Sequence, residues 1–245
     1  MLENSFELYY HYAETNWWFV GKWLIIKSLL DEVSPIASKP RILDIGCGTG
    51  EVMKRLQGRG LTVGIDMSME ALTYSSFRGC EALVQGDTFK LPFKDESFDI
   101  LIILDLFEHL EDDISAARMF TRLLKKGGHM VVTAPALYCL WSKRDVELHH
   151  FRRYTRHEME TLLENAGMRV KRSVLRNFFL FPIVWTKYTW EKLRRHEPEI
   201  KYDLVVVPRI VNWLLILVLK IETRLLKHLY LPAGSSVVCL AERIR

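Results

Sequence analysis

The sequence predicts an α/β fold in which a mostly parallel sheet is flanked by helices. Short apolar runs alternate with helical patterns through residues 39–177, which is typical of parallel strands joined by helices. A glycine-rich segment directly follows the first apolar run, and this turn is a common ligand site in such folds. The chain has 245 residues, 49% of them hydrophobic, which suits one α/β domain with an elaboration.

The strands are expected where short runs rich in Val, Ile and Leu lie between turn signals. In chain order they are Arg41–Ile45, Leu61–Asp66, Glu81–Gln85, Phe98–Leu104, His129–Ala134 and Met168–Leu175. Helical patterns fill the intervals, at residues 1–35, Glu51–Gln57, Ser68–Arg78, Asp112–Lys125 and Thr155–Ala166. Ser68 is placed to cap the helix that it begins, and Thr155 and Glu158 form a capping-box pattern at the start of theirs. Gly127-Gly128 should end the helix at Asp112–Lys125.

The composition changes after residue 177, and this change suggests four parts of the chain. They are an N-terminal helical cap at 1–38, the α/β core at 39–177, an apolar helical insertion at 178–234 and a final strand of the core at 235–245. Ser235–Ala241 has a strand pattern, so the apolar region is expected to interrupt the core and not to follow it as a tail.

The most specific motif is RILDIGCGTG at residues 41–50, where a strand runs into a glycine loop that opens a helix. Gly46, Gly48 and Gly50 would let the backbone turn tightly and approach a ligand closely. The dinucleotide-binding pattern would need another glycine at position 51, but the chain has Glu51, which is unfavourable beside a pyrophosphate. The loop therefore disfavours a nicotinamide cofactor.

The acid-x-Gly-x-Gly-x-Gly pattern that begins at Asp44 resembles the first motif of class I S-adenosylmethionine-dependent methyltransferases. The resemblance implies a Rossmann-like sheet, mostly parallel with an antiparallel last strand, and S-adenosyl-L-methionine as cofactor. VGID, which ends at Asp66, GDTFKLPF at residues 86–93 and FDILIILDLFEHL at residues 98–110 resemble later motifs of the family in the same order. The residues that it implies around the cofactor are Asp44, Gly46, Cys47, Gly48, Gly50, Asp66, Met67, Asp87, Thr88, Leu104, His109, Trp18 and Lys22.

Three other segments, NWWFVGKW near the N-terminus, HHFRRYT and PAGSSVV, resemble bacterial methyltransferases of polysaccharide and lipid-linked sugar pathways. This resemblance implies that Trp18 caps the cofactor and that Lys22 reaches its carboxylate, in a place where relatives often have arginine. Trp17, Trp18 and Phe19 form an aromatic cluster in the first of these segments, and plain core packing is its alternative explanation.

The polar and aromatic insert at residues 137–154 follows the fifth strand, which is the usual place for acceptor contacts in this fold. His150 is the expected general base, because a neutral imidazole accepts a proton at physiological pH, and His109 competes for that role. The acceptor contacts expected here are Trp141, His149, Arg152, Arg153 and Tyr154. Alternatively the insert is structural, its arginines paired with Asp145, Glu147 or Glu158. The four cysteines are scattered without a Cys/His cluster, so no metal is expected.

The apolar insertion contains an uncharged run at Ile210–Leu219 that is too short to cross a membrane. It continues with an apolar face and a basic face, so it is expected to lie on a membrane surface, or else to form a buried cap or a homodimer contact. We expect a cytoplasmic protein, peripheral at the inner face of the membrane, acting on a small or lipid-linked, saccharide-derived acceptor. The formal net charge of +4 gives no argument for nucleic acid. A non-catalytic scaffold and an NAD-dependent oxidoreductase are the rival functions.

Overall fold

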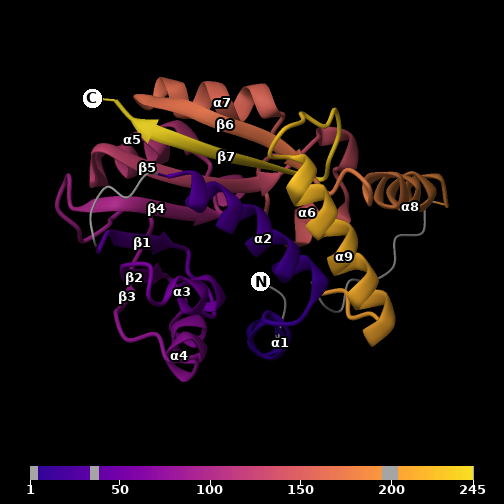
Figure 1. The fold of residues 1–245 in the computed structure, drawn as a ribbon, viewed down its shortest axis with the longest axis horizontal. Coiled ribbons are helices and arrows are strands. Elements are labelled where there is room, and N and C mark those ends of the chain that lie inside the picture. The colour runs from indigo at the N-terminus through magenta and orange to yellow at the C-terminus, as the bar shows by residue number, and fades with distance from the viewer. Residues whose placement is uncertain (1–4, 34–38, 195–203, 245) are drawn as a thin grey trace.

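The computed structural model describes residues 5–33, 39–194 and 204–244 and has a seven-stranded sheet between two layers of helices (Figure 1). The strands are β1 (Arg41–Ile45), β2 (Leu61–Asp66), β3 (Leu83–Gln85), β4 (Phe98–Leu104), β5 (Leu124–Pro135), β6 (Met168–Arg176) and β7 (Ser236–Arg243). Their order in the sheet is β3-β2-β1-β4-β5-β7-β6, and β7 is antiparallel to both of its neighbours. This confirms the expected Rossmann-like sheet with an antiparallel last strand.

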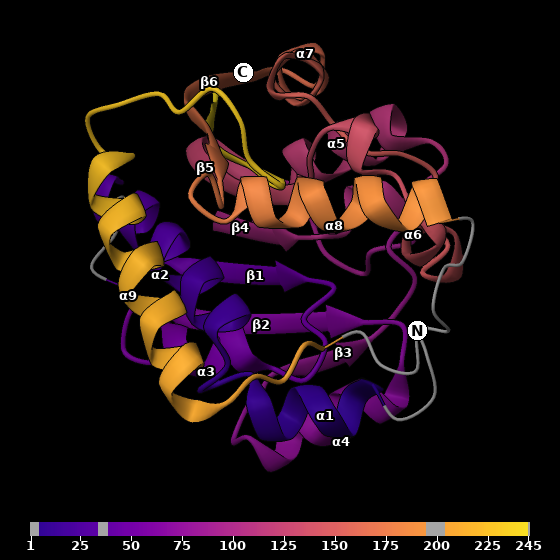
Figure 2. The same cartoon turned by 90° about the vertical axis from the view of Figure 1, so that its right-hand side faces the viewer.

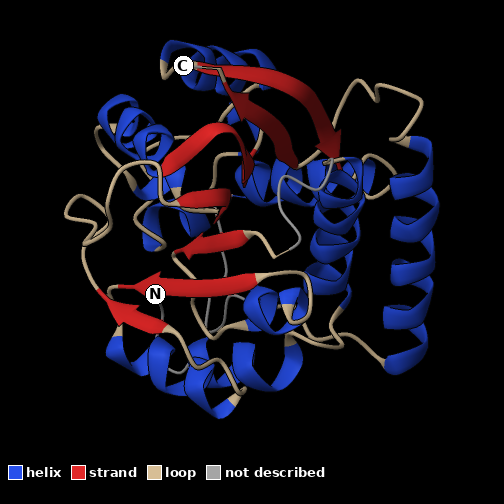
Figure 3. Ribbon diagram, turned by 60° about the vertical axis from the view of Figure 1, so that its left-hand side comes forward, coloured by secondary structure: helices blue, strands red, loops and turns tan. Residues whose placement is uncertain are grey.

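Helices cover both faces of the sheet (Figure 3). They are α1 (Ser5–Tyr12), α2 (Trp17–Glu32), α3 (Glu51–Leu56), α4 (Met69–Phe77), α5 (Asp113–Leu123), α6 (Lys143–Glu147), α7 (Arg156–Asn165), α8 (Phe181–Arg194) and α9 (Arg209–Leu225). Two 3₁₀ turns, η1 (Phe107–His109) and η2 (Tyr138–Leu140), complete the described elements. The Ser68 cap and the Thr155–Glu158 capping box are both present.

Two buried apolar clusters hold the layers together, one on each face of the sheet. The first joins side chains of α5 and α7 to the strands, among them Phe120, Leu163 and Met130. The second joins α2, α3 and the end of α9 to the opposite face, through residues such as Ile26 and Leu56. Because β1 and β4 lie at the centre with helices on both sides, their side chains are almost wholly buried, which explains why their sequences are mostly apolar.

Several expected boundaries were wrong, and two of them have a clear physical cause. The N-terminal region forms two helices and not one, because Asn16 leaves the helical conformation and its side chain accepts a hydrogen bond from the Trp18 N–H at the start of α2. The helix expected to run to Lys125 ends at Leu123, because Leu124 is fully buried and already pairs with Phe98 in the sheet. Pairing with β4 therefore overrides the local helical preference. Residues 1–4, 34–38, 195–203 and 245, which fall within the expected cap, insertion and last strand, lie outside the described residues.

The apolar insertion between β6 and β7 forms α8 and α9, and α9 lies beside α2 (Figure 2). α9 runs beside α2, and the two backbones approach closely at Gly21, where an added Cβ would collide with Leu219. α8 projects from the body of the molecule (Figure 1). The final strand β7 then returns to lie between β5 and β6.

Candidate active site

The glycine loop connects β1 to α3 at the carboxyl edge of the sheet. Gly46, Gly48 and Gly50 all have positive φ values, a conformation that glycine adopts without strain. A side chain at Gly50 would collide with Ser75 and Cys80, so glycine is needed there for space as well. At Gly48, in contrast, an added Cβ would meet no atom within 4 Å, which leaves the backbone of the loop open to a ligand.

Asp66 stands at the end of β2 and connects this loop to the next helix. Its Oδ2 accepts the Gly48 N–H at 2.9 Å, and its Oδ1 accepts the Ser68 N–H at 2.9 Å. The carboxylate is only partly buried, so each oxygen keeps lone-pair capacity for a further donor such as a ribose hydroxyl. The contacts position Asp66 beside the open backbone of the loop.

Asp44 and Glu51 place two more carboxyl groups behind the loop. Asp44 is only 2% exposed, and burial, reinforced by the neighbouring Glu51 and Asp66, raises its pKa to about 8. Burial also raises the pKa of Glu51, although its ion pair with Arg55 opposes that change. A site that gathers buried carboxyl groups in this way favours a ligand that carries positive charge.

The residues expected around the adenine are on the surface of the described structure. The Asp87 carboxylate is exposed and accepts the Phe89 N–H at 2.9 Å, which fixes the turn that contains Thr88. Met67 is 76% exposed beside that turn, free of packing that a bound adenine would have to displace. Their position next to Asp66 along the same edge of the sheet is compatible with the expected roles.

Lys22 reaches over the end of β4 from helix α2. Its Nζ lies 2.5 Å from Oδ2 of Asp105, whose Oδ1 accepts a 2.7 Å hydrogen bond from the Thr133 hydroxyl. Burial alone would raise the pKa of Asp105, but Lys22 and Thr133 hold it below its usual value. Leu104, the last residue of β4, lies directly before this pair. In this structure the ammonium of Lys22 is therefore bound by a carboxylate of the chain.

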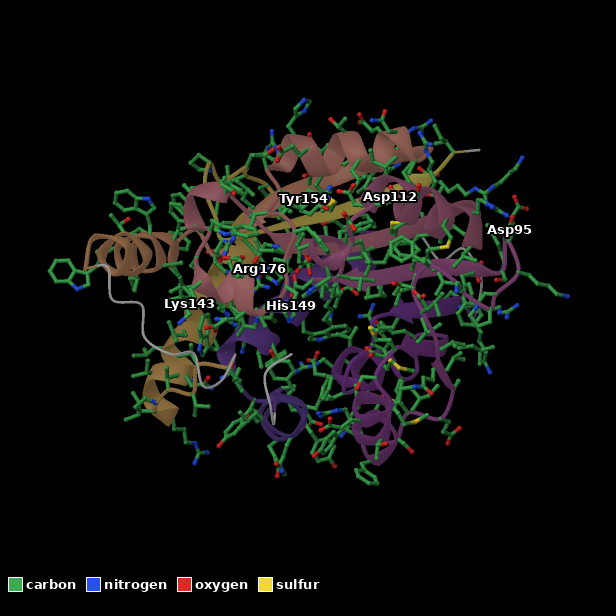
Figure 4. The ribbon with its side chains drawn as sticks, turned by 180° about the vertical axis from the view of Figure 1, so that it is seen from behind. Asp95, Asp112, Lys143, His149, Tyr154 and Arg176 are labelled. Atoms are coloured by element: carbon green, nitrogen blue, oxygen red, sulfur yellow. The ribbon has the colours of Figure 1, made fainter. Side chains whose placement is uncertain are left out.

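Trp18 is half-buried, and the positively charged guanidinium of Arg176 lies over its ring. The Arg176 guanidinium lies 5.1 Å from the Trp18 ring centroid, at the end of β6 (Figure 4). Arg176 is 2% exposed, and burial lowers its pKa to about 10 despite the nearby Asp105 and Glu222. Sequence reasoning missed this arginine, because the strand pattern around it gave no reason to single it out.

The two candidate bases come together beyond Asp105. The rings of His109 and His150 are 4.7 Å apart in an edge-to-face arrangement. Burial and the neighbouring His150 lower the pKa of His109 to about 4, so its imidazole is neutral at physiological pH. Nδ1 of His150 lies 2.9 Å from a carboxylate oxygen of Asp145, which fixes the orientation of that ring. Glu108, which the sequence analysis did not select, is buried beside them.

The two arginines of the insert are both paired with carboxylates of the chain. Arg153 makes two hydrogen bonds to the carboxylate of Asp145, and Arg152 pairs with Asp113 at 2.8 Å. The Tyr154 hydroxyl donates to Asp113 at 2.7 Å and is buried (Figure 4). The Arg153 contact is the one expected from the structural alternative, whereas Arg152 and Tyr154 connect the insert to α5 through Asp113.

The remaining acceptor candidates lie at the rim of the insert. Trp141 is half-buried and stacks on Tyr138, with ring centroids 5.3 Å apart. His149 is exposed and has a φ of 57°, a left-handed conformation that turns the chain just before His150 (Figure 4). Of the expected acceptor residues, His149 is the one that is exposed.

The residues present fit S-adenosylmethionine on the chemistry of the donor set. The ligand is a cation with a sulfonium, an ammonium and two ribose hydroxyls, and the edge of the sheet offers the carboxyl groups of Asp44, Asp66 and Asp105. The open backbone at Gly48 provides the space for close approach. When bound, this cofactor supplies a methyl group on a positively charged sulfur.

Comparison with known proteins agrees with this chemistry. Residues 43–132 match the family model described as "Methyltransferase domain". The chain is 34% identical over 113 residues to the human "Probable tRNA methyltransferase 9B", in a match that covers 45% of this chain and 24% of that protein. It is 39% identical over 98 residues to the "Ubiquinone biosynthesis O-methyltransferase" of Alkalilimnicola ehrlichii, covering 37% of this chain and 40% of that protein.

A solved structure shows the same fold over most of the chain. Phosphoethanolamine N-methyltransferase 2 of Haemonchus contortus, in complex with S-adenosyl-L-methionine, superposes with a TM-score of 0.60 at 16% identity. That match covers 93% of this chain and 56% of the other. The two curated relatives above are matched over less than half of their own length, which limits their likeness to the domain. Residues 43–132 therefore match a methyltransferase domain, and the described chain has the fold of a structure solved with S-adenosyl-L-methionine bound.

Proposed function

We propose that the chain transfers a methyl group from S-adenosylmethionine to a small, lipid-linked, saccharide-derived acceptor at a membrane surface. The observation that carries the proposal is the Asp145–His150 pair, which places an oriented imidazole next to His109 beyond the end of β4. An acceptor that enters between the insert and the end of β4 would meet these histidines next to Asp105.

The role of the chain's own groups in that step is to orient the acceptor and to receive its proton. Because the Asp145 carboxylate accepts from Nδ1 of His150, the Nε2 atom carries the free lone pair. A nucleophilic oxygen of the acceptor can donate its proton there while the new C–O bond forms. The electron pair of the broken C–S bond remains on sulfur, so the charges balance. Lys22 and Asp105 border the same space and help to exclude water.

The surface of α8 and α9 supports the choice of acceptor. The apolar face expected from the sequence is exposed, not buried against the rest of the described chain, and its large members on α9 include Ile210, Trp213, Leu214, Leu217 and Ile221. Arg209, Lys220 and Arg224 are exposed on the same helix, where they could meet anionic head groups. The described part of α8 adds an apolar hollow lined by Pro182, Ile183, Thr186 and Trp190. Within the described residues, every helix is too short or too polar to cross a bilayer.

These features favour a helix pair that lies in the membrane interface and brings the site to a lipid-linked acceptor without extracting it. The matched proteins have names that point to different acceptors, a tRNA and a ubiquinone precursor, so the names alone do not choose between them. The exposed apolar face favours the lipid over nucleic acid.

The activity is tested by incubating the protein with methyl-labelled S-adenosylmethionine and fractionated cell extract. We expect label in the lipid fraction and none in RNA. His150→Ala should reduce the rate by about 10²–10⁴-fold if His150 is the base. The proposal is wrong if label appears in RNA or if the variant retains the wild-type rate.

The membrane association is tested with vesicles of anionic and neutral lipid. The wild-type chain should co-sediment with anionic vesicles, and salt should weaken part of that binding. Trp213→Ser, Leu217→Ser and Ile221→Ser together should abolish it, with the thermal midpoint retained, because all three side chains are exposed. The opposite result would assign this face to a homodimer. In that case the wild-type protein would not bind vesicles and would sediment as a dimer, and the triple variant would sediment as a monomer.

A further inference from the structure

Three potential metal ligands meet at the turn after β4, although they come from two separate segments. Glu108 and His109 belong to η1, and His150 belongs to the insert that packs over it. One ligand atom from each of the three lies within 4.8 Å of the others. Atoms this close need to shift only slightly to bind a common cation, whose bonds to nitrogen and oxygen are about 2.0–2.2 Å long.

Glu108 provides an independent reason to expect a cation. Its side chain is 1% exposed, and its Oε2 has no hydrogen-bond partner. A buried carboxyl group of this kind is costly unless it is protonated or faces a positive charge. Lys22, the nearest ammonium on α2, is already bound by Asp105.

The ligand set also has the outer contact that is typical of metal-binding histidines. A histidine that binds a metal usually donates its other ring N–H to a carboxylate, which fixes the ring and raises its basicity. Here the carboxylate of Asp145 accepts from Nδ1 of His150, and Asp145 is itself held by Arg153 and by the Ser142 N–H at 2.9 Å. The orientation of His150 is therefore set before any ligand arrives.

We propose that Glu108, His109 and His150 bind a divalent transition-metal cation, with Zn²⁺, Mn²⁺ and Fe²⁺ as the matching class. Two imidazoles favour these ions over Mg²⁺, which prefers an all-oxygen set. Three protein ligands leave at least one coordination position open. The inference rests on the proposed function only in assigning that position to the acceptor; the binding of the cation does not depend on it.

The cation changes the role of His150 in the methyl transfer. With Nε2 bound to the metal, His150 is a ligand, and the acceptor oxygen binds the open position instead. A bound cation lowers the pKa of a coordinated hydroxyl, so the proton leaves to water and the oxyanion attacks the methyl carbon. The C–O bond forms as the C–S bond breaks, and its electron pair stays on sulfur.

Binding is tested with Co²⁺ and Zn²⁺ on the full chain, after treatment with a chelator. The protein with one equivalent of bound Co²⁺ should absorb visible light, and added Zn²⁺ should displace the Co²⁺ and abolish that absorption. Glu108→Gln and His109→Ala should each weaken Zn²⁺ binding at least about tenfold. The matched control is His149→Asn, because His149 is an exposed neighbouring histidine outside the cluster and Asn tolerates its left-handed conformation. It should bind Zn²⁺ like the wild type.

Folding of the variants is checked by the thermal midpoint without metal. Glu108→Gln should keep that midpoint while losing the upward shift that Zn²⁺ gives the wild type. Zn²⁺ binding that is absent in the wild type, or unchanged in Glu108→Gln, overturns the proposal. Tight Zn²⁺ binding without methyl transfer to any extract fraction would sustain the metal site and reject the proposed function. Methyl transfer that resists the chelator, by a chain that binds no Zn²⁺, would sustain the proposed function and reject the metal site.

Discussion

Asp145 binds both His150 and Arg153 through one buried carboxylate, and Nδ1 of His150 lies 2.9 Å from its Oδ1. Asp145 is 1% exposed, so it has almost no contact with solvent. Burial alone would raise its pKa, but the hydrogen bonds from His150 and Arg153 hold it well below its usual value. Asp145 is therefore a permanently charged positioning residue for His150.

Replacing this carboxylate should affect turnover more than cofactor binding. Asp145→Asn removes the charge and lets His150 change tautomer, so we expect kcat to fall by about 10–100-fold. The dissociation constant for S-adenosylmethionine, measured by calorimetry, should stay unchanged, because Asp145 lies outside the glycine loop. Asp95→Asn is the matched control, since Asp95 pairs with Arg122 on the exposed surface. An equal loss of cofactor affinity in Asp145→Asn would show that the residue has a general structural role.

The second prediction concerns Asp66, whose carboxylate accepts the Gly48 and Ser68 N–H groups. Asp66→Ala should weaken S-adenosylmethionine binding, because each lost charge-assisted hydrogen bond to a ribose hydroxyl contributes roughly 1.5–3 kcal/mol. It should also lower the thermal midpoint, since two backbone donors lose their acceptor. Asp66→Asn keeps one oxygen and should recover part of both losses. Calorimetry and thermal unfolding measure the two effects separately, and wild-type affinity in Asp66→Ala would contradict the cofactor assignment.

The third prediction is a pH dependence that comes from Asp44, whose pKa is raised to about 8 in the ligand-free chain. A carboxyl group with a raised folded pKa stabilises the fold at low pH, and this stabilisation is lost as the pH rises from the unfolded value of about 4 towards 8. A bound sulfonium cation favours the ionised form, so binding should release a proton below pH 8. Affinity for S-adenosylmethionine should then rise with pH by up to about tenfold per unit.

Calorimetry in buffers of different ionisation enthalpy measures that proton release directly. Asp44→Asn should abolish the proton release. It should also make the affinity for S-adenosylmethionine nearly independent of pH below the raised pKa of about 8. The ligand-free variant should also be more stable than the wild type at pH 8, because it buries no ionising group. If binding releases no proton in the wild type, Asp44 is not ionised by the cofactor.

The fourth prediction concerns the crossing of α2 and α9. An added methyl at Gly21 would collide with the Cδ1 atom of Leu219, which is the end of a flexible side chain. Gly21→Ala should therefore destabilise the chain by about 1–3 kcal/mol, as overpacking does. Leu219→Ala opens space at the same point, so the double variant should be more stable than the sum of the two single effects predicts. Strict additivity in urea unfolding would show that the helices do not pack there.

Much of the fold was predictable because its strands carry strong local signals. β1 and β4 are buried on both sides, so their sequences are mostly apolar, and both were found to within a residue. The break after α1 was missed because Asn16 acts through a single cap at a point where the helical pattern does not change. The early start of β5 was missed because it depends on pairing with Phe98, which is a tertiary effect.

Only the part of the site that lies in sequence motifs could be predicted. The glycine loop and Asp66 occur at a fixed spacing, so they could be assigned from the chain alone. The approach of Glu108 to His150 could not be predicted, because α5, β5, η2 and α6 lie between the two residues in the chain. The sequence also left Arg153 open between a ligand contact and an internal ion pair, and only the position of Asp145 selects the latter.

The position of β7 in the sheet has a consequence for the order of events during synthesis. This strand comes last in the sequence but occupies a slot between β5 and β6, with hydrogen bonds to both. Until the ribosome has made residue 243, β5 and β6 have no common neighbour, and each presents an unpaired edge to other chains. During that interval the nascent protein already carries α8 and α9 with their exposed apolar side chains. Early contact of those helices with a lipid surface would protect the growing chain from aggregation before its sheet can close.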